Sequence, residues 1–149
     1  MLKRIRYISE FSRHMSPADI ERLAQQSAVA NQARDITGIF VATGELFFQV
    51  IEGPVAEIDG LYGKITGDDR HRQVLLLEVE QGDLTRLFPD WAMRKLDLSD
   101  ESMRRLSAAR SILKAIHAQR IVQQNLRTAL EQTLWQEVIS SGSLKNPEG

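Results

Sequence analysis

Gln49 lies inside the apolar run 47–51, Phe-Phe-Gln-Val-Ile. Successive side chains of a strand point to opposite faces, so Gln49 shares a face with Phe47 and Ile51. An amide on such a face needs partners for its donors and its acceptor. The ordinary interpretation is a Gln that caps a neighbouring strand or faces solvent. The alternative is an amide held in a site, where it can either donate or accept a hydrogen bond.

Other side chains that could take part in chemistry also have ordinary structural interpretations. Tyr7 is typical of a strand tyrosine with a hydrogen-bonded hydroxyl, and Asn31 of a helix-terminal residue that tolerates left-handed geometry. Trp91 and Met93 share one face of the last predicted strand, where packing is their usual role. His71 follows Asp69-Arg70 in a polar segment and is interpreted as a surface turn residue.

Composition excludes several classes of chemistry. The chain has no cysteine, so disulfides, thiolate catalysis, thiol adducts and Cys-ligated metals are excluded. His14 and His117 have no partners at metal-ligand spacing, so no metal site is expected. Nineteen Lys and Arg balance 20 Asp and Glu, giving a net charge of -1. This nearly neutral net charge gives no overall electrostatic field that would attract nucleic acid or an anionic membrane. Neither is therefore an expected partner.

The length of 149 residues fits one domain with an appended helical element. Residues 1–5 lead directly into an alternating pattern without a signal-peptide core, and no apolar run reaches 18 residues. Secretion and membrane spanning are therefore not expected. The lack of disulfides agrees with a cytoplasmic location, which is our prediction.

The periodicity predicts an α+β fold for residues 1–98. Ser16-Pro17 begins the first helix, Thr43-Gly44 turns a hairpin, and Gly53-Pro54 precedes the second helix. Residues 74–79 are expected to form a largely buried strand, and the face of the first strand that carries Tyr7 should point inward. Right-handed crossovers give a ferredoxin-like arrangement with both helices on one face. The predicted order is strand 2–9, helix 17–30, strands 36–41 and 46–51, helix 55–67, strand 74–79 and a strand within 88–98.

Residues 99–140 are predicted to be one long helix or a helical pair. Ser99-Asp100-Glu101 provides an N-cap with acids in the first turn, and no Gly or Pro interrupts the segment before Gly142. Its apolar stripe must pack on the sheet, on a second copy, or on both. A homodimer is expected through residues 100–140, and 141–149 should be a flexible tail or linker. The candidate seam consists of Leu113, Ile116, Ile121 and Leu126.

Taken together, six separate motifs resemble the BLUF family of flavin-using blue-light sensors. The resemblance covers about residues 2–98 and agrees with the predicted fold. The motifs are Tyr7-Ile8-Ser9, Asn31 with Asp35-Ile36-Thr37-Gly38, Phe48-Gln49-Val50-Ile51-Glu52-Gly53, Leu61-Tyr62, Asp69-Arg70-His71, and Arg86-Leu87-Phe88-Pro89-Asp90-Trp91-Ala92-Met93.

The resemblance implies a non-covalently bound flavin (FAD, FMN or riboflavin) between the two helices. Tyr7 would donate an electron and a proton after light absorption. Gln49 would be the switch: rotation or tautomerisation of its amide would give a new hydrogen bond to the flavin. Ser9 would orient Gln49 or Trp91.

The remaining roles implied by the resemblance concern the rim of the flavin site. Asn31 would hydrogen-bond the ring edge, and Arg70 and His71 would contact the ring or the flavin side chain. Trp91 and Met93, on the last strand, would both respond to Gln49.

Three positions depart from the commonest family pattern. Asp35 stands where a glycine often precedes Ile-Thr-Gly, Ala30 replaces the first of two Asn residues, and Ala92 replaces Ser between Trp91 and Met93. None removes Tyr7, Gln49 or Asn31, so photoactivity is predicted.

The sensor part looks most similar to the sensor modules of photoactivated adenylate cyclases. The helical region has no acid/base pair, nucleophile or phosphate loop, so we predict a photosensory module rather than an enzyme. Its output would be a protein partner or a fused effector such as an adenylate cyclase. Two alternatives are a flavin-free, acylphosphatase-like hydrolase using Arg34 and Asn31, and a purely structural dimerisation module.

Overall fold

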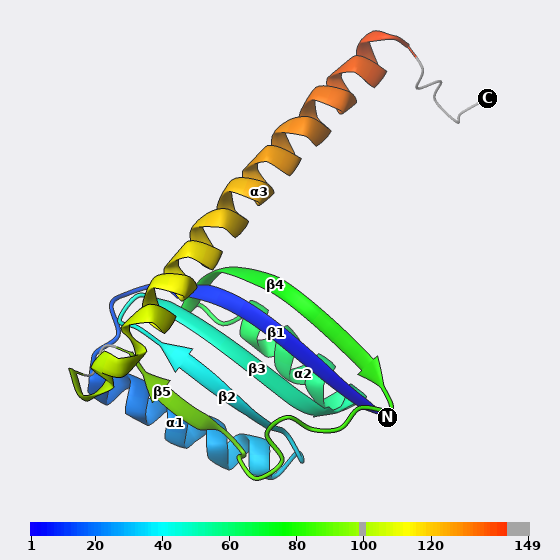
Figure 1. The fold of residues 1–149 in the computed structure, drawn as a ribbon. Coiled ribbons are helices and arrows are strands. Elements are labelled where there is room, and N and C mark those ends of the chain that lie inside the picture. Colours follow the sequence, from blue (N-terminus) through cyan, green and yellow to red (C-terminus); the bar gives the residue numbers. More distant parts are fainter. Residues whose placement is uncertain (99–100, 143–149) are drawn as a thin grey trace. The chain divides into compact units, whose positions relative to one another are not determined.

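The structure is a computed structural model that describes residues 1–98 and 101–142, without the side chains of 101–103. Ser99 and Asp100 of the predicted N-cap and residues 143–149 of the predicted tail lie outside the described residues. Figure 1 shows the order of the elements, which confirms the predicted α+β class. The elements are β1 (Leu2–Phe11), α1 (Pro17–Gln32), β2 (Thr37–Ala42), β3 (Leu46–Pro54), α2 (Val55–Thr66), β4 (His71–Gly82), β5 (Arg94–Asp97), the 3-10 helix η1 (Glu101–Leu106) and α3 (Ser107–Ser140).

The five strands form one mixed sheet in the order β4-β1-β3-β2-β5. Neighbouring strands are antiparallel except β2 and β5, which are parallel. Helix α1 packs on β2 and β5, and α2 packs on β1, β3 and β4. The first four strands and two helices therefore have the predicted ferredoxin-like arrangement, and β5 extends it beside β2.

The ends of α1 follow from local chemistry. Ser16 and Asp19 form a capping box at its start, with Pro17 in the first turn. Asn31 lies in the last turn rather than beyond it, and its carbonyl accepts hydrogen bonds from the N–H groups of Arg34 and Ile36, both at 3.0 Å. The left-handed residue is Asp35, with φ of 55°. Asn31 is therefore helix-terminal as expected, but the residue in the left-handed conformation is Asp35.

Strand β4 corrects the prediction of a largely buried strand. Of the predicted segment 74–79, only Leu75 is buried, while Leu76 and Val79 are exposed. Strand β4 lies at the edge of the sheet and, among the described residues, only β1 pairs with it. An apolar run cannot by itself distinguish an edge strand from a central one.

Both faces of β1 are buried. Tyr7 points inward as predicted, with no exposed surface. On the opposite face Arg4 and Ile8 are also buried. Part of this cover is the connector between β4 and β5, residues 83–93, because Arg4 Nη2 donates to the Thr85 carbonyl at 2.5 Å.

The chain divides into two compact units, Met1–Lys114 and Ala115–Gly149. A single helix, α3, runs from Ser107 to Ser140, so the segment is one long helix after η1 and not a pair. Leu113 is buried within the first unit and is therefore unavailable to a dimer seam. In the part of the chain that the structure describes, no helix is long and apolar enough to cross a membrane.

Gly38 is required by a close approach of β2 to β3. A Cβ added at Gly38 would lie 2.1 Å from the Val50 carbonyl oxygen, whereas one added at Gly60 in α2 would meet nothing. We expect Gly38→Ala to lower the free energy of unfolding by about 2 kcal/mol, because a backbone atom must shift. Gly60→Ala, the control, should raise it by about 0.5–1 kcal/mol. Urea unfolding measures both, and a Gly38→Ala protein as stable as wild type contradicts the fold.

Candidate functional site

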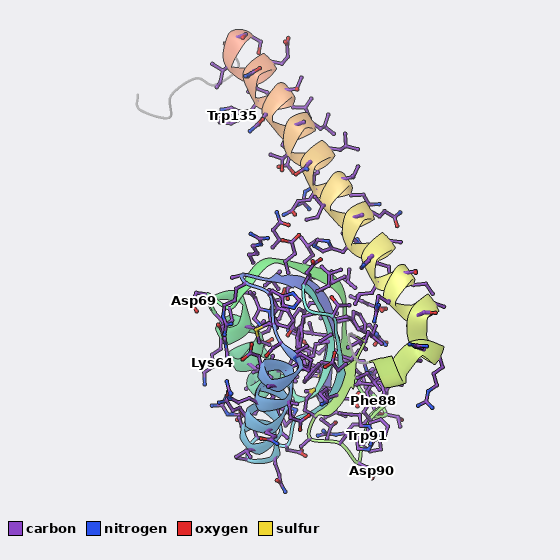
Figure 2. The ribbon with its side chains drawn as sticks, turned by 90° about the vertical axis from the view of Figure 1, so that its left-hand side faces the viewer. Lys64, Asp69, Phe88, Asp90, Trp91 and Trp135 are labelled. Atoms are coloured by element: carbon purple, nitrogen blue, oxygen red, sulfur yellow. The ribbon has the colours of Figure 1, made fainter. Side chains whose placement is uncertain are left out.

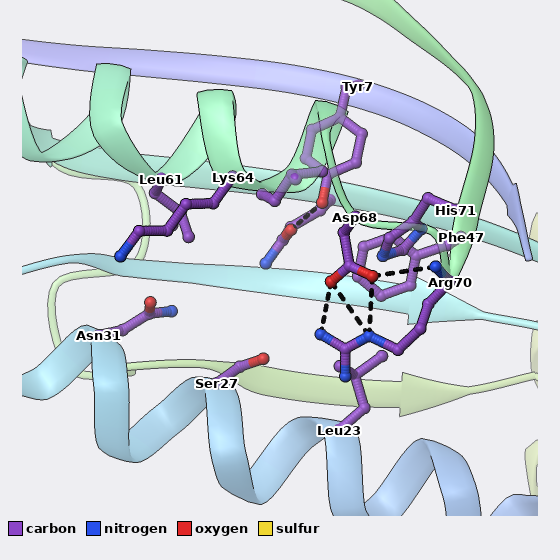
Figure 3. Close-up of a pocket in the computed structure, with 12 residues that line it drawn as sticks. Tyr7, Leu23, Ser27, Asn31, Phe47, Leu61, Lys64, Asp68, Arg70 and His71 are labelled. Carbon is purple, nitrogen blue, oxygen red and sulfur yellow. Dashed lines mark hydrogen bonds and ion pairs between the residues drawn. The ribbon is translucent and has the colours of Figure 1, made fainter.

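A cavity of about 240 Å³ lies between α1 and α2 over the centre of the sheet. Figure 3 shows side chains of the two helices facing one another across it, with Tyr7 on the sheet side. Both helices and the sheet contribute apolar and polar side chains to its walls, and the α2–β4 segment contributes charged and polar ones. The lining residues are Leu23, Ser27 and Asn31 from α1, Leu61, Lys64 and Ile65 from α2, Tyr7, Phe47 and Gln49 from the sheet, and Asp68, Arg70 and His71 from the α2–β4 segment.

Tyr7 and Gln49 form a hydrogen-bonded pair in the wall of the cavity. They are direct cross-strand partners in the β1–β3 register. The Tyr7 hydroxyl donates to Gln49 Oε1, and Gln49 Nε2 donates to Met93 Sδ at 3.4 Å. The amide thus joins a phenol to a thioether, and its two ends differ as acceptor and donor.

Burial controls the protonation of Tyr7. The removal of its phenol from water raises the pKa of Tyr7 well above its ordinary value, and Tyr62 and Asp68 add to this shift. The hydroxyl therefore keeps its proton at neutral pH. Because the Tyr7 hydroxyl donates to Gln49 Oε1, its proton has a direct path to Gln49.

The Ser9 hydroxyl contacts His71 and not Gln49 or Trp91. Ser9 Oγ and His71 Nδ1 are 2.9 Å apart. The His71 ring also packs on Phe11 and Phe47, at centroid distances of 5.5 and 5.2 Å. The hydrogen bond of Ser9 is thus to His71 rather than to the switch amide or the tryptophan, and the orienting role of Ser9 stays a prediction. The interpretation of His71 as a surface turn residue is wrong, because it begins β4 and lines the cavity.

Charged groups lie at the mouth of the cavity. Arg70 donates to both Asp68 carboxylate oxygens, with Nη2 to Oδ2 at 2.6 Å, and this lowers the pKa of Asp68 to about 2. Arg70 thus lies at the cavity as predicted, although its guanidinium is engaged by Asp68. Lys64 was missed by sequence reasoning, because a lysine on an exposed helix face carries no signal of its own. No carboxylate among the described residues forms an ion pair with Lys64.

Asn31 lies in the cavity wall as predicted and has an additional tertiary contact. Its Nδ2 donates to the Ala92 carbonyl at 3.1 Å, which ties α1 to the segment just before β5. The cavity thus touches the β4–β5 connector through two amides, Asn31 at Ala92 and Gln49 at Met93.

Trp91 and Met93 do not lie on the last strand, because β5 begins at Arg94. They also differ in position: Met93 packs against the core, while Trp91 is 40% exposed and stacks on Phe88 at 5.9 Å. Figure 2 shows Trp91 and Phe88 together on the connector, away from Lys64. The expectation that Trp91 and Met93 share one strand face is wrong. Residues two positions apart share a face only in an extended strand, and both residues precede β5.

The cavity fits the ring system of a flavin. A flat ring with one polar edge needs apolar walls and convergent hydrogen-bonding groups, and Leu23, Phe47 and Ile65 supply walls while Asn31 and Gln49 supply amides. Among the described residues, no three His, Asp or Glu side chains cluster to hold a metal.

The arrangement does not resemble a phosphate site. Arg34 is absent from the cavity lining, and its Nε lies 3.9 Å from a Glu57 carboxylate oxygen. Asn31 is engaged with Ala92. The pair proposed for an acylphosphatase-like hydrolase therefore does not converge on one ligand.

Burial of His71 predicts a pH dependence. Desolvation lowers the pKa of His71, and Arg70 lowers it further, whereas Asp68 raises it. We expect a midpoint below 6.5 when the imidazole of the dark protein is titrated by NMR. Since the unfolded chain binds the proton more readily, the stability due to neutral His71 is complete above pH 6.5 and is lost as the pH falls through the folded pKa. Asp68→Asn should lower the midpoint further, and a midpoint at or above 6.5 contradicts this.

Comparison with known proteins identifies the family. The model of the BLUF family, sensors of blue-light using FAD, matches residues 2–94. Photoactivated adenylate cyclase subunit beta of Euglena gracilis is 30% identical over 96 residues, which are 62% of this chain and 11% of that protein. The chain thus spans about a tenth of the length of the curated relatives it matches.

Solved structures agree with this match. A bacterial light-regulated adenylyl cyclase is 38% identical with a TM-score of 0.76, covering 84% of this chain and 36% of that one. Klebsiella pneumoniae BlrP1 with FMN and cyclic diGMP is 35% identical with a TM-score of 0.60, covering 66% and 26%. BlrB, a BLUF protein in its dark state, is 31% identical with a TM-score of 0.66, covering 87% and 96%. With the Tyr7–Gln49 pair in the wall of a cavity between α1 and α2, the chain belongs to the BLUF family of flavin-using blue-light sensors.

Proposed function

We propose that this chain is a blue-light photoreceptor that binds a flavin non-covalently in the cavity between α1 and α2. The observation that carries the proposal is the hydrogen bond from the Tyr7 hydroxyl to Gln49 Oε1 in the cavity wall. FAD is the flavin that we expect, because the family description specifies it, and FMN is the alternative, because the BlrP1 structure contains it. A location in the cytoplasm stays a prediction.

A bound flavin would supply the absorption of blue light and an acceptor for one electron. Tyr7 would be the donor of that electron and of its hydroxyl proton, and Gln49 Oε1 is the atom in position to receive the proton. Rotation or tautomerisation of the Gln49 amide exchanges its donor and acceptor ends. Because Gln49 Nε2 contacts Met93 Sδ, this exchange also changes the contact one residue before β5.

The output that we propose runs from β5 to the C-terminal helix. Its target is a separate protein or a fused effector, and an adenylate cyclase is the example that the relatives suggest. BlrB, of which the chain covers 96%, is an example of a BLUF protein of similar length. In a homodimer that forms through α3, a movement of this helix would also act on the second copy of the chain.

We propose a different seam for that dimer from the one predicted from the sequence. Leu113 is buried. Ile116, Ile121 and Leu126 follow one another at steps of five residues, which spreads them over about 220° of the helix, so one seam cannot contain them all. Exposed apolar residues recur instead every four positions, within an arc of about 120°. We propose these as the seam: Val122, Leu126, Leu130 and Leu134, each more than half exposed.

Absorption spectroscopy tests the photoreceptor. The wild-type protein should show a flavin spectrum that shifts reversibly to the red under blue light. Tyr7→Phe should retain flavin and lose the shift, because the proton donor is gone, and Gln49→Leu should also lose it. The matched control is Tyr62→Phe, whose ring lies 5.8 Å from that of Tyr7 and which should keep the shift. A protein that takes up no flavin contradicts the proposal, and so does a shift that survives in Tyr7→Phe.

Sedimentation velocity tests the dimer. Leu126→Lys with Leu130→Lys should weaken self-association at least about tenfold, because charges would enter an apolar seam. Gln132→Lys, about 200° around the helix from Leu130, is the control and should associate like wild type. A wild-type protein that remains monomeric at high concentration in both dark and light contradicts the seam.

A further inference from the structure

A carboxylate on the sheet face opposite the cavity is almost fully enclosed. Glu52 is 1% exposed and lies three residues after Gln49 on β3, so the two side chains point to opposite faces. A carboxylate has about four acceptor positions, and four donors surround this one. They are Arg4 Nε at 3.0 Å, Thr37 Oγ1 at 3.4 Å, and the backbone N–H groups of Leu87 at 3.0 Å and Phe88 at 2.6 Å.

The two backbone donors belong to the β4–β5 connector, and its preceding residues are fixed by the same cluster. Buried Arg4 donates to the Thr85 carbonyl at 2.5 Å and to Glu80 at 2.8 Å. Arg86 donates to Thr37 Oγ1 and to the Asp35 carbonyl, both at 2.9 Å. Each residue from Thr85 to Phe88 is therefore attached to β1, β2 or the turn that precedes β2, or to Glu52 on β3.

The other end of the connector lies at the cavity. The Gly38 N–H donates to the Trp91 carbonyl at 2.9 Å, Asn31 Nδ2 to the Ala92 carbonyl, and Gln49 Nε2 to Met93 Sδ. Met93 is only five residues beyond Phe88. A chain spans at most about 3.5 Å per residue, so the fixed segment limits where Met93 can lie.

We propose that Glu52, together with Arg4, is a positioning residue for the light response. It holds residues 85–88 on the sheet so that Met93 stays in contact with Gln49. A change in the Gln49 amide then moves β5, whereas a mobile connector would absorb the change without moving the strand. The light-driven part of this inference rests on the proposed function, whereas the effect on the dark structure does not. An amide at position 52 cannot replace the carboxylate, because it has only one acceptor oxygen. Its NH₂ group would face N–H or O–H groups that are themselves donors.

Glu52→Gln tests the proposal, and Glu80→Gln is the matched control. Both remove a carboxylate that binds Arg4, but Glu80 has no contact with the connector among its hydrogen bonds in the described residues. In the dark, Glu52→Gln should speed amide hydrogen exchange at Leu87 and Phe88 at least about tenfold and shift the Met93 methyl NMR signal. Glu80→Gln should leave both as in wild type.

The light response gives the second measurement. Glu52→Gln should keep the red shift of the flavin spectrum, because Tyr7 and Gln49 lie on the other face. The light-induced change in hydrogen exchange of β5 should fall at least twofold. A purely structural role for Glu52 would lower thermal stability without moving the Met93 signal or the β5 response, and that result overturns the proposal.

Glu52→Gln leaves the buried Arg4 without one of its two carboxylate partners, and this loss could prevent folding. A second variant therefore tests the same proposal. Arg4→Met with Glu52→Leu removes both charges and still leaves the Leu87 and Phe88 N–H groups without the carboxylate. It should reproduce the faster exchange and the altered Met93 signal. Wild-type behaviour in a folded variant overturns the proposal. If wild type itself shows no red shift, the proposed function fails, while the dark-state comparison still decides the role of Glu52.

Discussion

The site depends on the register between β1 and β3. Tyr7 and Gln49 are direct cross-strand partners on the two central strands, and both side chains face the helices. A slip of one residue would turn one of the two side chains to the other face and separate the hydroxyl from the amide. The pair is also enclosed, since Tyr7 has no exposed surface. In this environment a hydrogen bond between two neutral groups is strong enough to set the orientation of the amide.

Irregularities of the sheet gather around this pair. The β1–β4 register shifts between Arg6 and Tyr7 and again between Ile8 and Glu10. Gln73, in β4 near the second shift, has φ of 50°. Such bulges re-aim side chains next to functional sites. Here they lie beside Tyr7 and Ser9, and Ser9 meets His71 at the start of β4.

The connector between β4 and β5 links the two faces of the sheet. It crosses from one edge strand to the other, and its residues contact Glu52 on one face and Gln49 and Asn31 on the other. This path explains why Arg4, on the face of β1 opposite Tyr7, is buried. It also explains Asp35, whose left-handed backbone is held by Arg86 through both its carbonyl and its carboxylate. That position often has a glycine in the family because the conformation favours one.

The sequence by itself determined the element order, the N-terminal cap of α1 and the presence of the flavin-sensor motifs. Local signals suffice for these features: Ser16-Pro17 begins α1, and alternation over 2–9 places Tyr7 inward. Only the tertiary structure decided that β4 is an exposed edge strand, that Ser9 binds His71, that Leu113 is buried, and that Trp91 and Met93 precede β5 and lie apart. Each of these depends on contacts between residues far apart in the chain. Periodicity reports the face of a residue but not what covers that face, and here the cover is supplied by the connector and by neighbouring strands.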